Sequence, residues 1–321
     1  MKKKILITFK HTEAVEEKAH QLFEVIPSEG KRLNADEILS LTLEHQVDAL
    51  LVSHGQKFDE ELINKLPSSV KVIATSSVGF DHLDLGSAKN KKITLTNTPD
   101  VLSDATATLT MMLMLNVSRR AREYMDIMNE GWRRSFGQSE MLGMDLNNKT
   151  LAIFGMGAIG RDVAHKARAF GMKIIYCNRR RLSPELEEGA QYYESLEKMI
   201  PHADVLSLHA PATSETMGLM NKKMFSLMKK TAIFINVARG NLVDEAALQE
   251  ALENNQIFGA GLDVFVHEPD FDQKFLNFKN VFLTPHMGSA TIETRNAMGF
   301  LCLENIQYVL EGKKAKTEIQ G

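Results

Sequence analysis

The stretch LAIFGMGAIG, residues 151–160, decides the fold of the chain around it. Its first four residues are apolar and predict a buried parallel strand. Gly155, Gly157 and Gly160 follow at G-x-G-x-x-G spacing, and residues 161–170 continue with helical periodicity. In a dinucleotide-binding fold, the first of these glycines permits a tight turn and the second lets the backbone approach a pyrophosphate. The third allows the helix to pack closely on the strand.

The residues after this helix supply the context that the glycines need. A second apolar run at 173–177 predicts another strand. G-x-G-x-x-G between a strand and a helix is typical of dinucleotide binding, whereas the glycines alone could form an ordinary turn. The helix N-terminus would offer unpaired N–H groups and a positive dipole end to the phosphates. We therefore expect the phosphates to contact Gly155, Met156, Gly157, Ala158, Ile159 and Gly160.

The chain has the composition of a soluble globular protein with room for two domains. It has 321 residues, of which 44% are hydrophobic and 25% are charged. The formal net charge of −3 argues against a bulk attraction to nucleic acid or to an anionic membrane. No apolar stretch is long enough to span a bilayer, and the apolar run at 5–9 is too short for an export signal. Cys177 and Cys302 lack metal-ligand spacing, so we expect no metal site and a reduced, cytoplasmic compartment.

Strands and helices alternate in two separate parts of the chain, a rhythm that predicts parallel sheets with helices on both faces. The first part has expected strands at 5–9, 49–52, 70–75 and 93–96 and expected helices at 13–23, 35–43 and 59–66. The second has expected strands at 151–154, 173–177, 204–208, 232–236, 259–264 and 281–284. Between the two parts, one long helical run at 101–129 predicts a hinge helix, and an irregular polar arm at 131–148 follows it. After the second part, a helix is expected at 291–310.

The residue that ends the second strand of a dinucleotide-binding sheet lies beside the adenosine ribose. An acidic residue there would accept hydrogen bonds from the 2′-hydroxyl and repel a 2′-phosphate. Here Asn178 occupies this place and is followed by Arg179, Arg180 and Arg181. Guanidinium groups bind phosphate oxygens in a fork geometry. These residues favour NADPH over NADH. The alternative is that the arginines form a basic turn exposed to solvent with no cofactor role, and NAD is then the alternative cofactor.

Three polar side chains follow successive strands of the second part. Arg239, Glu268 and His286 each come after an apolar run, at the edge of the sheet that also carries the glycine loop. Taken singly, each has an ordinary explanation, as a surface charge, a solvated loop acid and a structural histidine. Together they predict one site at the carboxyl ends of parallel strands.

These segments resemble the D-isomer-specific 2-hydroxyacid dehydrogenases, and the resemblance covers nearly the whole chain. It is carried by SVGFDH at 77–82, NTP at 97–99, the glycine loop, LHAP at 208–211, NVARG at 236–240, GLDVF at 261–265 with Glu268 and Pro269, and TPH at 284–286 with Gly288. Asn178 with its arginines, and the EGW sequence at 130–132, are most similar to the glyoxylate/hydroxypyruvate reductase branch.

The resemblance implies an α/β fold of two doubly wound, parallel-sheet, Rossmann-like domains with the active site in the cleft between them. Residues 1–97 with 290–321 would form a discontinuous, flavodoxin-like substrate-binding domain, and residues 98–289 the NAD(P)-binding domain. The expected reaction is NADPH-dependent reduction of small 2-oxo acids, glyoxylate or hydroxypyruvate, to D-2-hydroxy acids. A homodimer is also expected. No nucleic acid or membrane partner is expected.

The resemblance also implies roles for individual residues. His286 would be the general acid, Glu268 would fix its tautomer, and Arg239 would hold the substrate carboxylate. The substrate-binding residues would be Val78 and Gly79 through their N–H groups, with Ser53, His54 and a neighbouring subunit's Trp132 shaping the pocket. Further cofactor contacts would come from Thr106, His209, Ala210, Pro211, Thr216, Val237, Ala238, Asp263 and Gly288.

Two other interpretations of the sequence stay open. The chain could be another member of the same superfamily, acting on D-lactate, phosphoglycerate or phosphite. It could also be a non-enzymatic dinucleotide sensor, like the corepressors that resemble this family. A substrate panel distinguishes the first alternative, and loss of the NADPH absorbance with glyoxylate distinguishes the second.

Overall fold

The computed structural model describes residues 2–28 and 30–320. The expected substrate-binding domain also includes residues 1, 29 and 321, which lie outside the described residues. The chain divides into two compact units. Unit 1 contains the residues up to Leu102 and those from Ser289 onward, and unit 2 runs from Ser103 to Gly288. The first boundary, after Leu102, lies beyond residue 97, where the sequence placed it. Asn97 and Thr98 still bond within unit 1, where the amide of Thr98 donates to the Ser77 carbonyl (2.9 Å).

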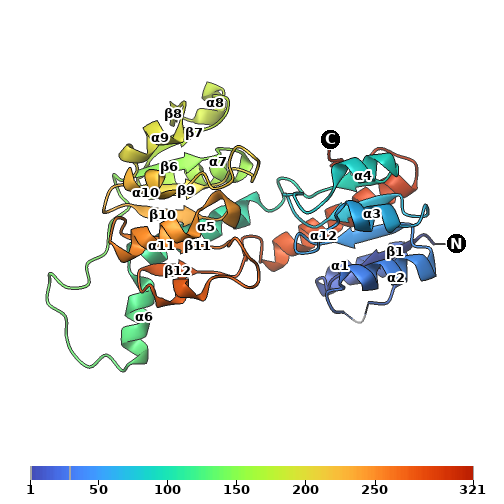
Figure 1. Cartoon of the computed structure of the whole chain (residues 1–321), viewed down its shortest axis with the longest axis horizontal. Helices are drawn as coiled ribbons and strands as arrows, with labels where there is room; N and C mark the ends of the chain where they lie inside the picture. Colours follow the sequence, from blue (N-terminus) through green and yellow to red (C-terminus); the bar gives the residue numbers. More distant parts are fainter. Residues whose placement is uncertain (1, 29, 321) are drawn as a thin grey trace. The chain divides into compact units, whose positions relative to one another are not determined.

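Unit 1 has a parallel sheet with helices on both faces (Figure 1). Its described strands follow the order β2-β1-β3-β4-β5, a doubly wound order of the flavodoxin type. Apolar residues of α2, α3 and α4 form one core, while α1 packs with the returning helix α12 on the other face. The elements are β1 (Lys4–Ile7), α1 (Glu13–Leu22), β2 (Glu24–Ile26), α2 (Ala35–His45), β3 (Ala49–Val52), α3 (Glu60–Lys65), β4 (Val72–Thr75), α4 (Leu85–Asn90), β5 (Thr94–Thr96) and α12 (Ile292–Leu310).

Unit 2 has a second parallel sheet, whose described strands follow the order β12-β11-β10-β9-β6-β7-β8 (Figure 1). The order reverses between β6 and β9, as in dinucleotide-binding folds. One core lies under α5 and α7, and the other under α9, α10 and α11. The strands are β6 (Thr150–Phe154), β7 (Lys173–Cys177), β8 (Gln191–Tyr193), β9 (Val205–Leu208), β10 (Ile233–Asn236), β11 (Gly259–Leu262) and β12 (Val281–Leu283).

The helices of unit 2 include several short ones that position loops. They are α5 (Ser103–Ser118), α6 (Ala121–Asn129), α7 (Ala158–Ala169), α8 (Pro184–Glu187), α9 (Leu196–Met199), α10 (Lys222–Ser226) and α11 (Glu245–Glu253). The fold class expected from the sequence, two doubly wound α/β parts, is confirmed. Among the described residues, no helix combines the length and the apolar character that crossing a bilayer requires.

The expectation of one continuous helix over 101–129 is wrong. The helix breaks after Ser118, and Arg120 takes the left-handed conformation (φ 56°) before α6 begins. The cause lies in the arm: the amide of Met144 donates to the Ser118 carbonyl (2.7 Å), and Gly143 packs directly on that carbonyl. The sequence also gave no signal for β2 and β8, which have three residues each and lie at sheet edges.

Candidate active site

The glycine loop of unit 2 has the shape that a dinucleotide pyrophosphate needs. Gly155 ends β6 at φ 93°, and a Cβ there would lie 2.4 Å from the Ala210 amide nitrogen. A Cβ on Gly160 would lie 2.7 Å from the Gly155 carbonyl oxygen, so this glycine keeps α7 close to the strand. A Cβ on Gly157 would meet nothing within 4 Å, and none of the described side chains caps the first amides of α7. The open space, the unpaired amides and the helix dipole fit a bound pyrophosphate.

Asn178 supports this loop directly. Its Oδ1 accepts a hydrogen bond from the Met156 amide (2.6 Å), which fixes the turn after Gly155. The three following arginines are not equivalent. Arg181 is held by the Glu187 carboxylate through Nε (2.7 Å) and Nη2 (3.0 Å). Arg179 and Arg180 are exposed, and within residues 30–320 no side chain pairs with them.

Arg239 follows β10 on a turn that is built by a buried asparagine. Asn236 is 1% exposed; its side chain donates to the Arg239 carbonyl (2.9 Å) and accepts from the Ala238 amide (3.1 Å). Gly240 comes next, and a Cβ there would lie 1.8 Å from the Phe265 carbonyl carbon. Only glycine therefore allows the Arg239 turn to lie against the loop that carries Glu268.

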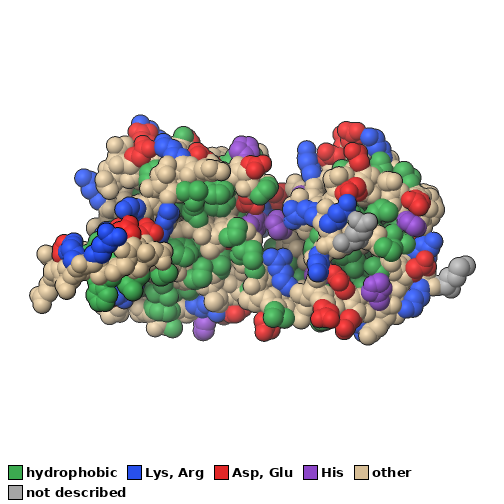
Figure 2. Space-filling model, turned by 90° about the horizontal axis from the view of Figure 1, so that it is seen from below, with side chains coloured by type: hydrophobic (Ala, Val, Ile, Leu, Met, Phe, Trp, Pro, Cys, Tyr) green, Lys and Arg blue, Asp and Glu red, His purple; other side chains and the backbone are tan. Residues whose placement is uncertain are grey.

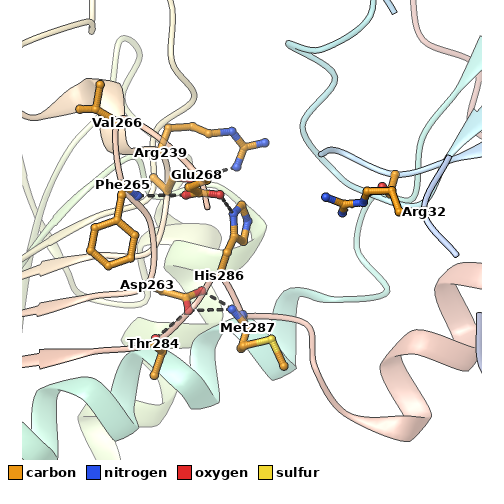
Figure 3. Close-up of polar contacts among 12 residues, drawn as sticks. Arg32, Arg239, Asp263, Phe265, Val266, Glu268, Thr284, His286 and Met287 are labelled. Carbon is orange, nitrogen blue, oxygen red and sulfur yellow. Dashed lines mark hydrogen bonds and ion pairs between the residues drawn. The ribbon is translucent and has the colours of Figure 1, made fainter. Parts of the chain in front are cut away.

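His286 and Glu268 form a short polar pair at the ends of β12 and β11. The Nδ1 of His286 lies 2.6 Å from Oε2 of Glu268, while the other carboxylate oxygen accepts from the Phe265 amide (2.9 Å). Figure 3 shows the side chains of Arg239, Glu268 and His286 lying next to one another. His286 has a left-handed backbone (φ 55°), a conformation that is uncommon for residues other than glycine.

A buried aspartate holds the His286 turn. Asp263 is 1% exposed and accepts hydrogen bonds from the Thr284 hydroxyl (2.6 Å) and from the amides of Met287 (2.7 Å) and Gly288 (2.9 Å) (Figure 3). Burial raises the pKa of Asp263, and these hydrogen bonds oppose that shift. Thr106 of α5 adjoins the same place, since a Cβ on Gly288 would lie 3.3 Å from its Oγ1. The structure thus brings Thr106, Asp263 and Gly288 together; their contact with a nicotinamide stays a prediction.

His209 ends β9 beside Gly155. Its Nε2 lies 2.8 Å from the Ser207 hydroxyl, whereas its Nδ1 is buried without a hydrogen-bond partner among the described residues. Burial lowers the pKa of His209 to about 3, so the ring is neutral at physiological pH. Ala210, Pro211, Val237 and Ala238 line the neighbouring strand ends, and the Thr216 hydroxyl closes its loop by donating to the Pro211 carbonyl (2.8 Å).

In unit 1, Val78 and Gly79 follow β4 with their amides available. The Val78 carbonyl accepts from the Asn97 side chain (2.8 Å), and the Gly79 carbonyl accepts from the Ser77 hydroxyl (2.7 Å). Among the described residues, the N–H groups of Val78 and Gly79 have no acceptor. The loop is therefore fixed through its carbonyls, and two N–H groups remain for an anion.

The expected specificity residues lie in different places. Ser53 is buried after β3, and the half-buried His54 follows it. Trp132 belongs to unit 2, where it is 59% exposed on the arm. The residues that sequence reasoning missed are positioning groups, namely Asn97, Asn236, Thr284 and Glu187. Asn97, Asn236 and Thr284 stand in motifs that carry the family resemblance, which is their sequence signal, whereas Glu187 ends the short helix α8 and had no such signal.

Comparisons with known proteins identify the family of the chain. Residues 111–288 match the family described as "D-isomer specific 2-hydroxyacid dehydrogenase, NAD binding domain". A glyoxylate reductase from Thermococcus litoralis is 43% identical over 274 residues, which cover 84% of this chain and 82% of the relative.

The chain belongs to the D-isomer-specific 2-hydroxyacid dehydrogenases.

Solved structures of this dehydrogenase family share the whole fold. One from Polaromonas sp. JS6 66, described as an NAD-binding D-isomer-specific 2-hydroxyacid dehydrogenase, covers 100% of both chains with a TM-score of 0.94 and 39% identity. The NADPH-dependent glyoxylate/hydroxypyruvate reductase from Sinorhizobium meliloti, in complex with NADP and malonate, has a TM-score of 0.88 and 32% identity and covers 99% and 97% of the two chains. The dehydrogenase described here is an oxidoreductase that binds a nicotinamide dinucleotide.

Proposed function

We propose that the protein reduces small 2-oxo acids, such as glyoxylate or hydroxypyruvate, to D-2-hydroxy acids with NADPH. The observation that carries this proposal is the 2.6 Å pair of His286 and Glu268 in unit 2, on the loops next to the Arg239 turn. A proton donor held by a carboxylate, next to a guanidinium for the substrate carboxylate, is what reduction of a 2-oxo acid needs. Relatives named glyoxylate reductase support the choice of substrate.

A nicotinamide dinucleotide, which the glycine loop at 155–160 with Thr106 and Asp263 would hold, would supply the hydride that reduces C2 of the 2-oxo acid. Arg239 binds the substrate carboxylate with paired donors and polarises the carbonyl. The amides of Val78 and Gly79 in unit 1 are also assigned to the substrate, and the glycine loop of unit 2 is assigned to the dinucleotide. His286 delivers a proton to the carbonyl oxygen as C2 is reduced. Glu268 at Nδ1 accepts a hydrogen bond from the ring, which holds its orientation and leaves the other ring nitrogen for the proton transfer.

The NADPH preference is proposed from the loop that follows β7. Asn178 is neutral and bonded to Met156, so no carboxylate repels a 2′-phosphate there. Arg179 and Arg180 are the exposed guanidiniums that we assign to this phosphate. Arg181 is bound by Glu187 and supports the loop. The NADP complex of the Sinorhizobium meliloti relative is consistent with this preference.

We also propose that the protein works as a homodimer in the cytoplasm. Exposed apolar side chains on α6 and the arm, including Met125, Met128 and Trp132, support the dimer. Cys177 and Cys302 are buried free thiols, as expected in a reducing compartment.

Steady-state kinetics test this function. Oxidation of NADPH, followed by loss of its absorbance, is measured with glyoxylate, hydroxypyruvate and pyruvate, and then repeated with NADH. We expect reduction of glyoxylate or hydroxypyruvate and a higher kcat/KM with NADPH. Replacing His286 by Gln should lower kcat by about 10²–10⁴-fold, the usual contribution of a general acid, with bound NADPH unchanged. A His286→Gln enzyme within several-fold of wild type would show that the acid is misassigned, and a higher kcat/KM with NADH would overturn the cofactor assignment.

A further inference from the structure

A second arginine lies at the carboxyl edge of the unit 1 sheet, outside the residues assigned so far. Arg32 is on the loop between β2 and α2 (Figure 3). The amide of the next residue, Leu33, donates to the carbonyl of Thr8 at the end of β1 (2.9 Å). Arg32 itself contacts Ser53, which follows β3. The strand order β2-β1-β3-β4-β5 reverses between β1 and β3, and open α/β sheets bind ligands at such a switch point.

The guanidinium of Arg32 packs over a glycine. A Cβ on Gly55 would lie 2.6 Å from Nη1, 2.7 Å from Nη2 and 2.8 Å from Cζ. Any other residue at this position would have to displace the guanidinium. The Nη2 group also lies 3.4 Å from the Ser53 hydroxyl, at the long end of a hydrogen bond. The guanidinium therefore contacts two residues of one loop.

That loop is held by a buried glutamine. Gln56 is 6% exposed, and its Oε1 accepts from the Thr8 hydroxyl (2.6 Å) and from the Ser53 amide (3.1 Å). Its Nε2 donates to the carbonyls of Leu33 (2.9 Å) and Thr8 (3.0 Å). One side chain thus ties together the end of β1, the loop of Arg32 and the loop of Ser53. These bonds fix the backbone next to Arg32 and the Ser53 loop, and the Arg32 side chain itself is exposed, so that a ligand can reach it.

The charge of Arg32 is not neutralised within the part of unit 1 that the structure describes. No carboxylate there pairs with Arg32. The adjacent Lys31 differs, because its Nζ binds the Glu37 carboxylate at 2.9 Å. An oriented guanidinium without a carboxylate partner, next to the Ser53 and His54 loop, is suited to bind an anion in a fork geometry.

We propose that Arg32 recognises a second anionic group, a carboxylate or a phosphate, on the side chain of the 2-oxo acid. This inference rests on the proposed function, which places the 2-oxo acid at the amides of Val78 and Gly79 in the loop that follows β4, the strand next to β3. The preferred substrates are then 2-oxo acids with a charged side chain. Glyoxylate, which has no side chain, is reduced without help from Arg32.

Matched substrate pairs test the proposal. Oxaloacetate and 2-oxobutanoate have nearly the same size and differ in a terminal carboxylate, and 3-phosphohydroxypyruvate compared with hydroxypyruvate tests a phosphate. Wild-type enzyme should reduce the charged member of at least one pair with a kcat/KM about ten-fold or more above the neutral member, and the pair that does so identifies the anion. Arg32→Gln should remove this preference and change kcat/KM for glyoxylate less than three-fold. Lys31→Gln is the control and should retain the preference.

A binding measurement separates this proposal from the proposed reaction. Without cofactor, calorimetry compares D-malate with D-2-hydroxybutyrate, which lacks the second carboxylate, on wild type and Arg32→Gln. We expect D-malate to bind more tightly to wild type and to lose about ten-fold in affinity in the variant, even if no 2-oxo acid is reduced. Equal effects of Arg32→Gln on the charged and neutral members of every pair would mean that Arg32 only supports the loop, and no effect on either would mean that it is a solvated surface residue; both results would overturn the proposal.

Discussion

At the scale of single residues, His11 gives unit 1 a specific dependence on pH. It follows β1, is 8% exposed, and its Nε2 is buried without a hydrogen-bond partner among the described residues. Burial, followed by the nearby charge of Arg295, lowers the pKa of His11 from 6.5 to about 4. Its neutral form is stable in the fold, whereas the unfolded chain takes up the proton below about pH 6.5. The stability linked to His11 is therefore fully present above pH 6.5 and is lost as the pH falls towards 4.

Replacing His11 by Gln should flatten this pH dependence. Between pH 7.5 and pH 4.5 wild type should lose on the order of 2–3 kcal/mol more unfolding free energy than the variant, because one pKa unit corresponds to about 1.4 kcal/mol. The measurement is the midpoint of thermal unfolding at each pH. His20→Gln changes an exposed histidine on the neighbouring helix and should follow wild type. Parallel curves for wild type and His11→Gln would show that His11 does not titrate in this range.

At the scale of elements, the loop from β7 to α8 depends on a buried carboxylate. Glu187 binds Arg181 through both oxygens and accepts from the Tyr176 hydroxyl (2.6 Å), which in turn accepts from the Leu182 amide (3.0 Å). The Arg181 and Tyr176 hydrogen bonds lower the pKa of Glu187 to about 2, so it stays ionised. Tyr176 is fully buried. These contacts hold the loop that presents Arg179 and Arg180.

Glu187→Gln and Arg181→Gln should therefore weaken NADPH binding in the same way, by releasing the loop. We expect KM for NADPH to rise about three- to ten-fold in both, with KM for NADH nearly unchanged. A double variant should behave like either single one, since both changes break one contact. Arg179→Gln with Arg180→Gln should instead remove the preference for NADPH altogether. Glu185→Gln, an exposed change on α8, is the control. Equal increases in both KM values would mean that Glu187 serves only the stability of the unit.

Elements that repeat a strong pattern could be predicted from the sequence, and those set by distant contacts could not. The strands β6, β7 and β9 were predicted because buried parallel strands are short apolar runs. The break between α5 and α6 was not, because Ser118 has ordinary neighbours in the chain and the interruption comes from Met144 in the arm. The helix α7 begins at Ala158, before the expected residue 161, because the Gly157 backbone starts it without a side-chain cap.

The candidate site shows the same division. Arg239, Glu268 and His286 could be proposed because each follows a strand of one parallel sheet, and their loops meet at its carboxyl edge. The groups that orient them could not be assigned, because an internal Asn236 or Asp263 looks like any polar residue after a strand. Their roles depend on which backbone amides they reach, and those distances come only from the folded chain.

At the scale of the whole molecule, the helix α6 exposes large apolar side chains. No residue of α6 is buried, and Met125 (60% exposed), Met128 (57%) and Trp132 (59%) lie on it or just after it. Figure 2 shows hydrophobic side chains gathered on the face of unit 2 that is in view there. Exposed apolar groups of this density are uncommon in monomers and are typical of interfaces.

We predict that two copies of the chain associate through α6 and the arm. Sedimentation equilibrium of wild type should give twice the 36.0 kDa mass of one chain. Met125→Glu with Met128→Glu places two charges on α6 and should give the monomer mass, because each buried carboxylate would lack a partner. Leu43→Glu with Leu186→Glu changes exposed apolar residues elsewhere and should leave the dimer intact.

If Trp132 also completes the neighbouring subunit's substrate pocket, the monomeric variant loses kcat/KM for hydroxypyruvate while NADPH still binds, and Trp132→Ala reproduces that loss in an intact dimer. A fully active monomer would contradict both roles, because neither the interface nor Trp132 would then be needed for the reaction.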